Sequence, residues 1–423
     1  MTFKLHGSAP HGTIIPPSSK SYAQRYILIA SLGNGKTQIR NITGSDDELV
    51  AIGISKEINT DVKYDRGTVS ISGSFRCPGT VYVGESATSF RLSLGLLSGK
   101  RCKTTFLMEE SLSSRPNAPL ENALMSRGVK INRIPENKIR IDASNINSLD
   151  VNINGEMSSQ FVSSLMMMAV AGHFDGNITV SGKETSGGYI GITENCLSEF
   201  GISVLRKPGF IRVSGKISNE NREIGVEPDF SSAAYFIVLG LLSSEKGILV
   251  SGLRNFSLQP DSAIIKILSN YLKIDQLEDL KLDVECRASN LGVIELDVDQ
   301  NPDLAPPLAV IGIFSEAGVI MRNIGRLSIK ESNRILGIVN LAELFGAIIN
   351  NDGSTLIIKR GKEIKKPEKI DFKDHRMIMA AAIATIVSGH SDTILFNEKN
   401  IGKSYPTFFM DLRKVGISTE ILS

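Results

Sequence analysis

One phrase recurs six times along the chain, and this repetition limits the folds that the sequence can adopt. Each copy is an apolar, helix-like run, then a small Gly or Ser stop, then a strand-like run, as in LGLLSGKRCKTTFL and VIGIFSEAGVIMRNI. The stops lie 66 to 74 residues apart, near Gly33, Gly99, Gly172, Ser244, Ser315 and Gly389. Units of this length are too long for a common solenoid repeat, so we expect each to form a small subdomain.

A second phrase lies between these copies and consists of a helix end followed by a hairpin-like pair of strands. FGISVLRKPGFIRVSG and FGAIINNDGSTLIIKRG are clear copies, and the copy around YLKIDQLEDLKLDVEC is degenerate. Helix and strand signals therefore alternate, which is typical of mixed α/β units. The runs SLMMMAVA and MIMAAAIATIV are apolar all round, so we expect interior helices whose methionines pack in the core.

Composition and charge exclude several classes of function. The 423 residues include 41% hydrophobic and 22% charged side chains, as in ordinary globular proteins of two or three domains. A net charge of +2 gives no field to hold a polyanion, so we expect no nucleic-acid partner. The longest apolar run is too short to cross a bilayer, and MTFKLHGSAP is not a signal peptide. We expect a soluble, cytoplasmic protein without a membrane partner.

The cysteines and histidines argue against a metal site. Cys77, Cys102, Cys196 and Cys286 are scattered and form no CxxC pair, and the five histidines form no HExxH motif. Such spacing suits a reducing compartment, in which cysteines stay as thiols, and it disfavours structural zinc. We therefore expect no bound metal.

Two stretches resemble the phosphate-binding loop of nucleotide-binding enzymes but lack its first glycine. ASLGNGKT carries Ala30 at that position and NEKNIGKS carries Asn397, and neither follows the strand-then-helix order that the motif requires. Turn glycines beside lysines explain both stretches, so an ATPase or kinase is disfavoured.

Short polar clusters interrupt the apolar stretches where helices are expected to begin. In PPSSKSYAQR, Lys20 and Arg25 follow a proline-rich turn; the other clusters are GESATSFR, SSRPNAP, MSSQF, TSGGY, NPDLAPP, SIKESNR, KDHRM and GKSYP. Taken singly, each is explained as a helix cap or a solvated helix face. Taken together, their cations and hydroxyls, with the amides of helix N-termini, indicate a site for small anions.

These motifs occur in the order found in 5-enolpyruvylshikimate-3-phosphate (EPSP) synthases, and the chain resembles that enolpyruvyl transferase family over nearly its whole length. IKESNR and DHRM are the most specific of them. The resemblance implies transfer of the enolpyruvyl group of phosphoenolpyruvate to the 5-hydroxyl of shikimate 3-phosphate, with release of phosphate, on the route to chorismate. It also implies an inside-out α/β fold of two domains, each with three βαβαββ units. We expect a monomer that needs no cofactor.

The resemblance also divides the chain and assigns its site. Residues 1–17 with 227–423 are expected to form one domain and 18–226 the other, with the active site in the cleft between them. The residues implied to bind shikimate 3-phosphate are Lys20, Ser21, Arg25, Ser158, Ser159, Gln160, Ser186, Tyr189, Asp303, Arg326 and Lys330. Those implied to surround phosphoenolpyruvate are Lys20, Ala87, Arg115, Gln160, Glu331, Arg334, His375, Arg376 and Lys403.

The chemistry of this reaction suggests roles for these residues. Two phosphates and two carboxylates need many cations, because repulsion between unit charges about 4 Å apart is roughly 4 kcal/mol at an effective dielectric constant near 20. Asp303 is suited to take the proton of the 5-hydroxyl, and Glu331, aided by Lys20, to protonate the methylene carbon if burial keeps it protonated. The cations suited to stabilise the tetrahedral intermediate are Arg115, Arg334, Arg376 and Lys403.

Three positions depart from the usual pattern of the family. Ala87 stands where many members carry glycine, and its methyl group is expected to crowd the inhibitor glyphosate and lower sensitivity to it. Leu92 replaces a frequent proline. Arg326 replaces a frequent asparagine, and it either makes a stronger contact to the shikimate phosphate or points away.

Two alternatives share the fold. A UDP-N-acetylglucosamine enolpyruvyl transferase usually carries a cysteine about five residues before the arginine that matches Arg115, where this chain has Glu110. A non-catalytic protein that binds small anions needs no acid and base, whereas this chain carries both Asp303 and Glu331. A phosphate-release assay with both substrates separates the three hypotheses.

Overall fold

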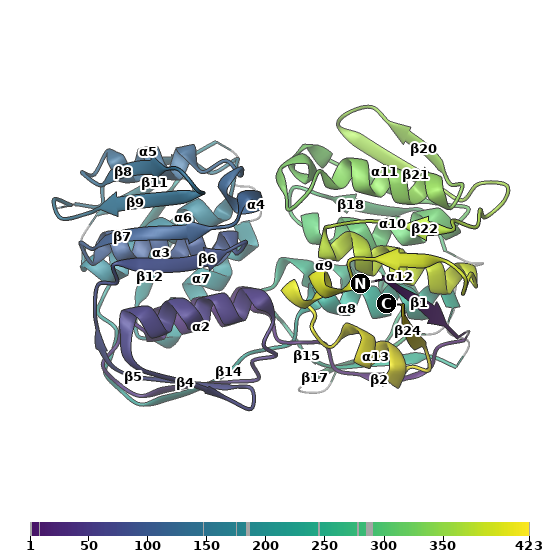
Figure 1. The fold of residues 1–423 in the computed structure, drawn as a ribbon, viewed down its shortest axis with the longest axis horizontal. Coiled ribbons are helices and arrows are strands. Elements are labelled where there is room, and N and C mark those ends of the chain that lie inside the picture. The colour runs from purple at the N-terminus through teal and green to yellow at the C-terminus, as the bar shows by residue number, and fades with distance from the viewer. Residues whose placement is uncertain are drawn as a thin grey trace. The chain divides into compact units, whose positions relative to one another are not determined.

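The fold consists of two compact parts. A computed structural model describes all residues except 1, 8, 147, 175, 183–186, 244–245, 277–278, 285–290 and 423, and the side chains of 275–276 and 279–281. The chain divides into Ser18–Val226, which we call the central unit, and Met1–Pro17 with Glu227–Ser423, which we call the terminal unit (Figure 1).

The central unit alternates strands and helices from its first residue onward. Its elements are α1 (Lys20–Ala30), β3 (Thr37–Arg40), α2 (Asp46–Ile58), β4 (Asn59–Asp65), β5 (Thr68–Phe75), β6 (Thr80–Gly84), α3 (Ala87–Gly99), β7 (Lys103–Met108), α4 (Glu110–Ser113), α5 (Ala118–Met125), β8 (Lys130–Ile134), β9 (Lys138–Asp142), β10 (Val151–Asn154), α6 (Ser159–Gly172), β11 (Asn177–Ser181), α7 (Gly187–Glu199), β12 (Ser203–Lys207), β13 (Phe210–Ser214) and β14 (Arg222–Gly225).

The terminal unit adds short 3-10 helices to the same alternation. Its elements are β1 (Thr2–His6), β2 (Gly12–Ile14), α8 (Phe230–Ser243), β15 (Ile248–Arg254), η1 (Pro260–Ser262), α9 (Ala263–Ile267), η2 (Ser269–Tyr271), β16 (Lys273–Gln276), β17 (Asp279–Val284), β18 (Ile294–Asp297), η4 (Pro302–Leu304), α10 (Ala305–Phe314), β19 (Val319–Arg322), η5 (Ile324–Ile329), α11 (Arg334–Leu344), β20 (Ile348–Asn351), β21 (Thr355–Lys359), β22 (Lys369–Ile370), α12 (His375–Ser388), β23 (Ile394–Phe396), η6 (Glu398–Lys403), α13 (Phe408–Lys414) and β24 (Ser418–Leu422).

The sheets of both units share one pairing pattern. In the sheet β6-β7-β9-β8, the first two strands are parallel and the other neighbouring pairs are antiparallel. Within the described residues, each unit has three such four-stranded sheets, and the remaining five are β10-β11-β13-β12, β14-β3-β5-β4, β2-β15-β17-β16, β18-β19-β21-β20 and β22-β23-β1-β24. The six repeats in the sequence are therefore six βαβαββ units, as predicted.

Three strands complete sheets whose other strands lie far away in the sequence. β2, which precedes α1, pairs with β15, and β14, which precedes α8, pairs with β3. β1 pairs with both β23 and β24. The chain thus leaves the terminal unit after β2 and returns to it after β14.

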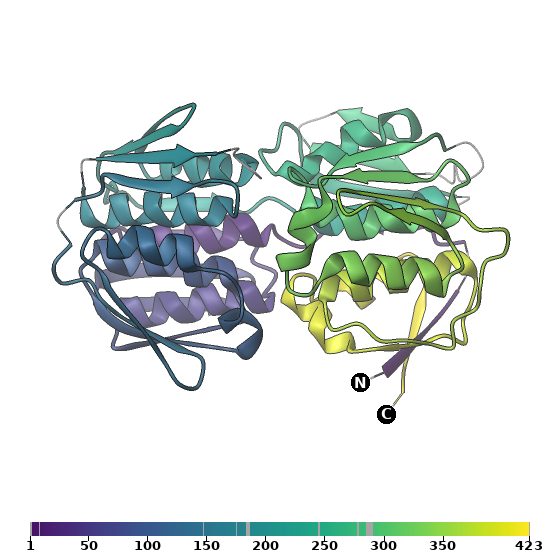
Figure 2. The same ribbon diagram turned by 90° about the horizontal axis from the view of Figure 1, so that it is seen from above.

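Helices form the interior of each unit, and the sheets lie outside them (Figure 2). All ten residues of α10 are buried, as are nearly all residues of α3, α6, α8 and α12. Gly95 allows α3 to touch α6, because a β-carbon there would overlap the carbonyl oxygen of Ser164. Met166 and Met377 are fully buried, so the prediction of core methionines is confirmed.

The recurring stops mark the C-terminal ends of interior helices. α3 ends at Gly99, α6 ends at Gly172, and Gly389 caps α12 in the left-handed conformation that glycine favours. Ser244, the expected stop after α8, lies outside the described residues. The spacing of the repeats therefore reflects one buried helix per βαβαββ unit.

The prediction that the cysteines stay reduced was wrong for one pair, because Cys77 and Cys102 form a disulfide. The parallel strands β6 and β7 pair Thr80 with Thr105. Each cysteine lies three residues before its member of this pair, so the register brings the two sulfur atoms together. The sequence separation of 25 residues hid this proximity.

Candidate active site

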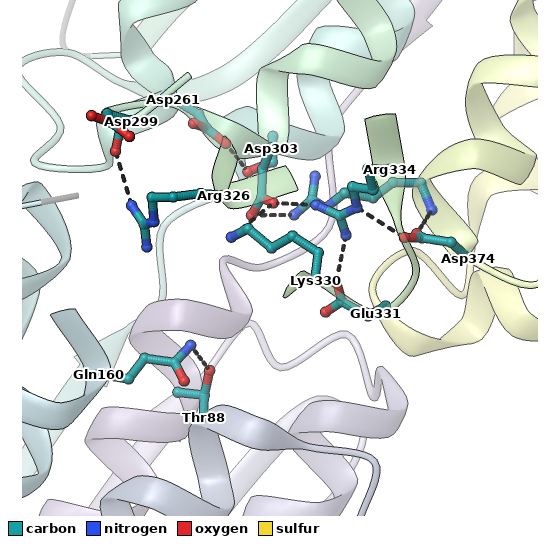
Figure 3. A network of polar contacts seen from close by, with 12 residues as sticks. Thr88, Gln160, Asp261, Asp299, Asp303, Arg326, Lys330, Glu331, Arg334 and Asp374 are labelled. Carbon is teal, nitrogen blue, oxygen red and sulfur yellow. Dashed lines mark hydrogen bonds and ion pairs between the residues drawn. The ribbon is translucent and has the colours of Figure 1, made fainter. Parts of the chain in front are cut away.

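A dense network of charged side chains lies in the terminal unit around Arg334, which is 1% exposed (Figure 3). Its guanidinium donates from Nη1 to Asp303 Oδ1 at 2.7 Å, from Nη2 to Glu331 Oε2 at 2.6 Å, and from Nε to Asp374 Oδ2 at 2.8 Å. One arginine thus binds three carboxylates. We call Asp303, Lys330, Glu331, Arg334, Asp374 and Arg376 the carboxylate network.

Asp303 is the point at which three cations of this network converge. Besides Arg334, Arg376 Nη2 lies 3.1 Å from its Oδ2, and Lys330 Nζ lies 3.9 Å from its Oδ1. Burial alone would raise the pKa of Asp303, but the charges of Arg376, Lys330 and Arg334 outweigh burial and hold that pKa well below its usual range. Asp303, whose side chain is 19% exposed, is therefore a partly buried carboxylate that remains ionised.

Burial lowers the pKa of the lysine of the network, whereas it raises that of a carboxyl group. It lowers the pKa of Lys330 to about 8, while the nearby charge of Asp303 opposes this change and that of Arg334 adds to it. The Arg334 guanidinium stays charged, because Asp374, Glu331 and Asp303 outweigh burial and raise its pKa. Lys330 is thus the cation of the network whose charge changes nearest to neutral pH.

Helix N-termini explain why these side chains meet. Asp374 caps α12, accepting a hydrogen bond from the backbone nitrogen of Arg376 at 2.9 Å through Oδ1, while its Oδ2 holds Arg334. Arg334 is itself the first residue of α11. The alternative of a solvated helix face is therefore wrong for Arg334, and the predicted N-cap role of Asp374 is confirmed together with a second contact.

The remaining predicted residues of the terminal unit lie on neighbouring elements. His375, the first residue of α12, is buried rather than on the surface, and its Nδ1 lies 3.6 Å from Asp374 Oδ1. Lys403 ends η6, which packs against α12. Arg326, on η5, donates from Nη1 to the carbonyl oxygen of Asp299 at 3.0 Å (Figure 3).

In the central unit the counterpart is a cluster in which arginines meet uncharged oxygens. Arg25 is 1% exposed and donates to Thr193 Oγ1 at 2.7 Å, to the carbonyl oxygen of Ser21 at 2.7 Å and to that of Tyr189 at 3.3 Å. Burial lowers the pKa of Arg25 from its ordinary value. These acceptors carry no net charge, so the guanidinium keeps its positive charge uncompensated by them.

Gln160 joins the helices α3 and α6 in the same way. Its Oε1 accepts a hydrogen bond from Arg91 Nη1 at 2.7 Å, and its Nε2 donates to Thr88 Oγ1 at 2.9 Å (Figure 3). Arg91 also donates to Asn117 Oδ1 at 2.8 Å. We call Thr88, Arg91, Gln160, Arg25 and Thr193 the hydroxyl cluster.

Side chains link the helix N-termini of the central unit to one another. Gln24 Nε2 donates to Ser86 Oγ at 3.0 Å, which ties α1 to the start of α3, and Gln160 ties α3 to α6. Arg25 ties α1 to α7 through Thr193. The free backbone amides of several helix starts therefore lie at one end of this unit, an arrangement suited to anions.

The other predicted residues of the central unit lie at these helix starts or close to them. Lys20 begins α1 and its Nζ lies 2.7 Å from Asp47 Oδ2, while Ala87 begins α3 and is buried. Ser158 caps α6, as its structural explanation predicted, and Ser159 is the first residue of that helix. Arg115 lies between α4 and α5, and Ser186 lies outside the described residues.

The described residues offer no arrangement of three or more His, Cys, Asp and Glu side chains that would hold a metal ion. Cys196 is buried and forms no disulfide with another described residue, and Cys286 falls outside that part of the chain. Among the helices that the structure describes, we find none with the length and apolar character needed to span a bilayer.

Comparison with known proteins identifies the family. The sequence matches the family model of EPSP synthase (3-phosphoshikimate 1-carboxyvinyltransferase) over residues 6–412. The chain belongs to the EPSP synthase family. Members of this family are transferases. Because the match covers nearly the whole chain, the resemblance found in the motifs is confirmed.

Relatives in this family match the chain from end to end. A 3-phosphoshikimate 1-carboxyvinyltransferase of Picrophilus torridus is 42% identical over 420 residues, which cover 98% of this chain and 99% of the relative. One of Thermoplasma volcanium is 40% identical over 415 residues, which cover 98% of each.

Solved structures confirm the predicted fold. An EPSP synthase from Acinetobacter baumannii has a TM-score of 0.82 at 21% identity, covering 100% of this chain and 99% of that one. The enolpyruvyl transferase NikO from Streptomyces tendae has a TM-score of 0.78 at 14% identity, covering 99% and 98%. Both belong to the two-domain α/β architecture expected from the family.

Sequence reasoning missed three partners of the predicted site residues. Asp374 and Arg91 were noticed but given no part in the site, and Asp47 was not singled out. Each is the N-cap of a helix or lies in its first two turns, and each contacts a predicted site residue in space. A search for charged residues at helix starts would have found all three.

Proposed function

We propose that this protein is a 3-phosphoshikimate 1-carboxyvinyltransferase, which joins phosphoenolpyruvate to shikimate 3-phosphate and releases phosphate. Full-length relatives carry this name. The observation that carries the proposal is Asp303, a partly buried carboxylate that three cations keep ionised. A base surrounded by movable cations is what the addition of a hydroxyl to an anionic enol ether requires.

Side chains of both units bind the two substrates in this proposal. The hydroxyl cluster supports it, since the partners of Arg25 among the described residues are uncharged oxygens, so Arg25 suits a phosphate or carboxylate. The residues proposed for shikimate 3-phosphate are Lys20, Ser21, Arg25, Ser158, Ser159, Gln160, Ser186, Tyr189, Asp303, Arg326 and Lys330. Those proposed for phosphoenolpyruvate are Lys20, Ala87, Arg115, Gln160, Glu331, Arg334, His375, Arg376 and Lys403.

The reaction needs one base and one acid. The base takes the proton of the 5-hydroxyl as its oxygen bonds to C2 of phosphoenolpyruvate, and the acid gives a proton to C3. The tetrahedral intermediate still carries its phosphate on C2. The phosphate then leaves with the electrons of the C2–O bond, and C3 loses a proton so that the double bond re-forms.

Asp303 becomes an effective base only when its cations find other partners. Arg334 and Arg376 form bonds to it that resemble those they would make to a substrate carboxylate or phosphate. When these guanidinium groups turn toward the substrates, Asp303 loses positive charge around it and its affinity for a proton rises. Substrate binding therefore activates the base.

Glu331 is the proposed acid, and the same exchange prepares it. Its ion pair with Arg334 at 2.6 Å favours the carboxylate form. Once Arg334 binds a substrate anion, Glu331 faces negative charge instead, which favours the protonated form. Lys20, now paired with Asp47 at 2.7 Å, assists by binding the substrate anions.

An assay of phosphate release tests the proposal. Purified protein is mixed with phosphoenolpyruvate and either shikimate 3-phosphate or UDP-N-acetylglucosamine, and the product is weighed by mass spectrometry. We expect phosphate and an enolpyruvyl ether with shikimate 3-phosphate alone. Turnover of the nucleotide sugar, or binding of both substrates without phosphate release, would support one of the two alternatives instead.

We further propose that the protein acts as a monomer in the cytoplasm. Persistent disulfides are rare in the cytosol of mesophiles, so the Cys77–Cys102 bond makes the location worth testing. Sedimentation at assay concentration tests the first statement. Cell fractionation tests the second, and activity outside the cytoplasmic fraction would contradict it.

A further inference from the structure

A fully buried carboxyl group lies close to Asp303 and has no part in the function proposed above. Asp261, in η1, is 1% exposed. Its Oδ2 accepts a short hydrogen bond from Ser231 Oγ, while its Oδ1 has no hydrogen-bond partner among the described residues. A buried carboxyl with one unsatisfied oxygen costs stability, so its presence calls for an explanation.

The backbone of the terminal unit fixes Asp261 beside Asp303 (Figure 3). Asn301, two residues before Asp303, donates from Nδ2 to the carbonyl oxygen of Pro260, the residue before Asp261, at 2.6 Å. This bond ties η1 to the turn that begins η4. Ser231 holds the other side of the carboxyl from the first turn of α8.

Groups from three elements face Asp261, and they shift its pKa in different directions. Burial raises the pKa of Asp261 to about 7, and the negative charge of Asp303 adds to this effect. Arg376 at the start of α12 and the hydrogen bond from Ser231 lower this pKa, and Asp229, just before α8, raises it. Two neighbouring carboxyls therefore differ, since Asp303 is held ionised while Asp261 exchanges its proton near neutral pH.

We propose that Asp261 is a positioning residue for Asp303, and that the charge on its buried carboxyl sets how readily Asp303 accepts the proton of the 5-hydroxyl. The inference rests on the proposed function, in which Asp303 is the base. When Asp261 is neutral, it adds no negative charge to offset the cations around Asp303, and Asp303 binds a proton weakly. An ionised Asp261 puts a like charge next to Asp303 and increases its proton affinity.

The pH dependence of kcat tests this role. In the wild-type enzyme kcat should rise as Asp261 ionises near pH 7. In Asp261→Asn, which keeps the shape but not the charge, this rise should disappear, leaving kcat near the wild-type value at pH 6 and roughly threefold to tenfold lower at pH 8.5. The KM values of both substrates should stay within about twofold, because a carboxyl group that is 1% exposed offers almost no surface to a substrate.

Ser231→Ala provides a second variant that keeps the carboxyl group. It removes a hydrogen bond that favours the ionised form, so the rise in kcat should move to higher pH by about half a unit or more. Burial lowers the pKa of Lys330 to about 8, and Lys330 is unchanged in these variants, so differences between variants isolate Asp261. Glu316→Gln, at an exposed acid of the same unit, serves as the control and should follow the wild type.

The outcomes separate this inference from the proposed function. A wild-type protein that releases no phosphate, or an Asp303→Asn variant with near-normal kcat, would overturn the function. An active wild type with an inactive Asp303→Asn variant, but with parallel pH profiles for the wild type and Asp261→Asn, would overturn the role of Asp261 alone. If Asp261→Asn does not fold, an unshifted profile in Ser231→Ala decides against it.

Discussion

The carboxylate network and the hydroxyl cluster hold arginines in opposite electrostatic states. Arg334 is bound by three carboxylates in the terminal unit, whereas Arg25 in the central unit is bound by a hydroxyl and two carbonyl oxygens. Both side chains are 1% exposed. An anion can therefore join Arg25 without displacing a charged partner, but it must compete with carboxylates for Arg334.

This difference indicates a division of labour between the two units. Dipoles that hold a cation in place prepare it for tight binding, because no ion pair has to be broken when an anion arrives. Carboxylates that hold a cation create a group whose proton affinity changes when the cation moves. The central unit is thus suited to anchoring, and the terminal unit to acid–base chemistry.

Removal of the base should have the largest effect. Asp303→Ala is expected to lower kcat at least 100-fold, about the loss that general base catalysis typically gives, with a smaller change in KM. Steady-state phosphate release measures both constants. Equal losses in the matched variant Glu316→Gln would show that the effect is not specific to the network.

Removal of the anchoring cation should come next and should act on binding. Arg25→Gln is expected to weaken binding of shikimate 3-phosphate by about 30-fold to 1,000-fold, as loss of a buried charge contact typically does. Titration calorimetry measures the dissociation constant, and Arg212→Gln, at an exposed arginine of the same unit, serves as the control. If Arg25→Gln lowered kcat and left affinity unchanged, the division of labour would be wrong.

The disulfide gives a test that concerns the central unit alone. Cys77→Ser is expected to lower the free energy of unfolding by about 3 kcal/mol, because the bond closes a loop of 25 residues in the unfolded chain. Urea denaturation followed by circular dichroism measures this loss. Since Cys102 lies beyond the C-terminal end of α3, kcat should be unchanged; a large fall in kcat would show that the bond supports the site.

Acid should separate the stabilities of the two units. Burial would raise the pKa values of Asp303 and Asp374, but nearby cations lower them, so their ion pairs stabilise the terminal unit above about pH 4 and lose that effect as pH falls further. Glu48 in the central unit affects stability with the opposite pH dependence. Burial raises its pKa, so protonation in acid removes the free-energy cost of holding a buried carboxylate charged. Asp261 in the terminal unit shares the sign of Glu48, since burial raises its pKa to about 7, so the ion pairs of Asp303 and Asp374 dominate only below about pH 4. Between pH 4 and pH 3 we expect the terminal unit to lose about 1 kcal/mol of stability and the central unit to lose less.

Hydrogen exchange with mass spectrometry measures this difference. Peptides of α11 and α12 are compared with peptides of α2 at pH 4 and pH 3, after correction for intrinsic exchange rates. Equal loss of protection in both units would contradict the assignment of the charge pairs.

The smallest expected effect concerns an inhibitor. Ala87→Gly is expected to lower the inhibition constant of glyphosate by about tenfold, since it removes a buried methyl group at the start of α3. Inhibition kinetics against phosphoenolpyruvate measure it, with Ala118→Gly at the start of α5 as the control. An inhibition constant of the wild type already in the low micromolar range would contradict the expected crowding.

The fold was predictable from the sequence, because each repeat contains one buried helix whose sequence is largely apolar. The runs that end near Gly172 and Gly389 are apolar all round, since α6 and α12 lie in the interior of their units. The partners inside the network were not predictable in the same way. Whether Arg334 meets Asp374 depends on which helix starts come together, and that is decided by packing between elements 40 residues apart.

The disulfide illustrates the same limit at a single pair. Cys77 and Cys102 become neighbours through the parallel register of β6 and β7, and no local pattern encodes that register. Asp261 was overlooked for a related reason. Its sequence context, SLQPDSA, reads as an ordinary turn, and only the Asn301–Pro260 bond brings it to Asp303.

The pairing of β1 with β24 has a consequence for how the protein is made on the ribosome. Every strand of the central unit's sheets lies between Thr37 and Gly225, so this unit can fold while synthesis continues. β1 must wait for β24, about 400 residues later, and at typical elongation rates that delay is roughly 20 to 80 seconds. During this interval the strand that carries the core residues Phe3 and Leu5 stays unpaired, which makes the nascent terminal unit a natural client for chaperones.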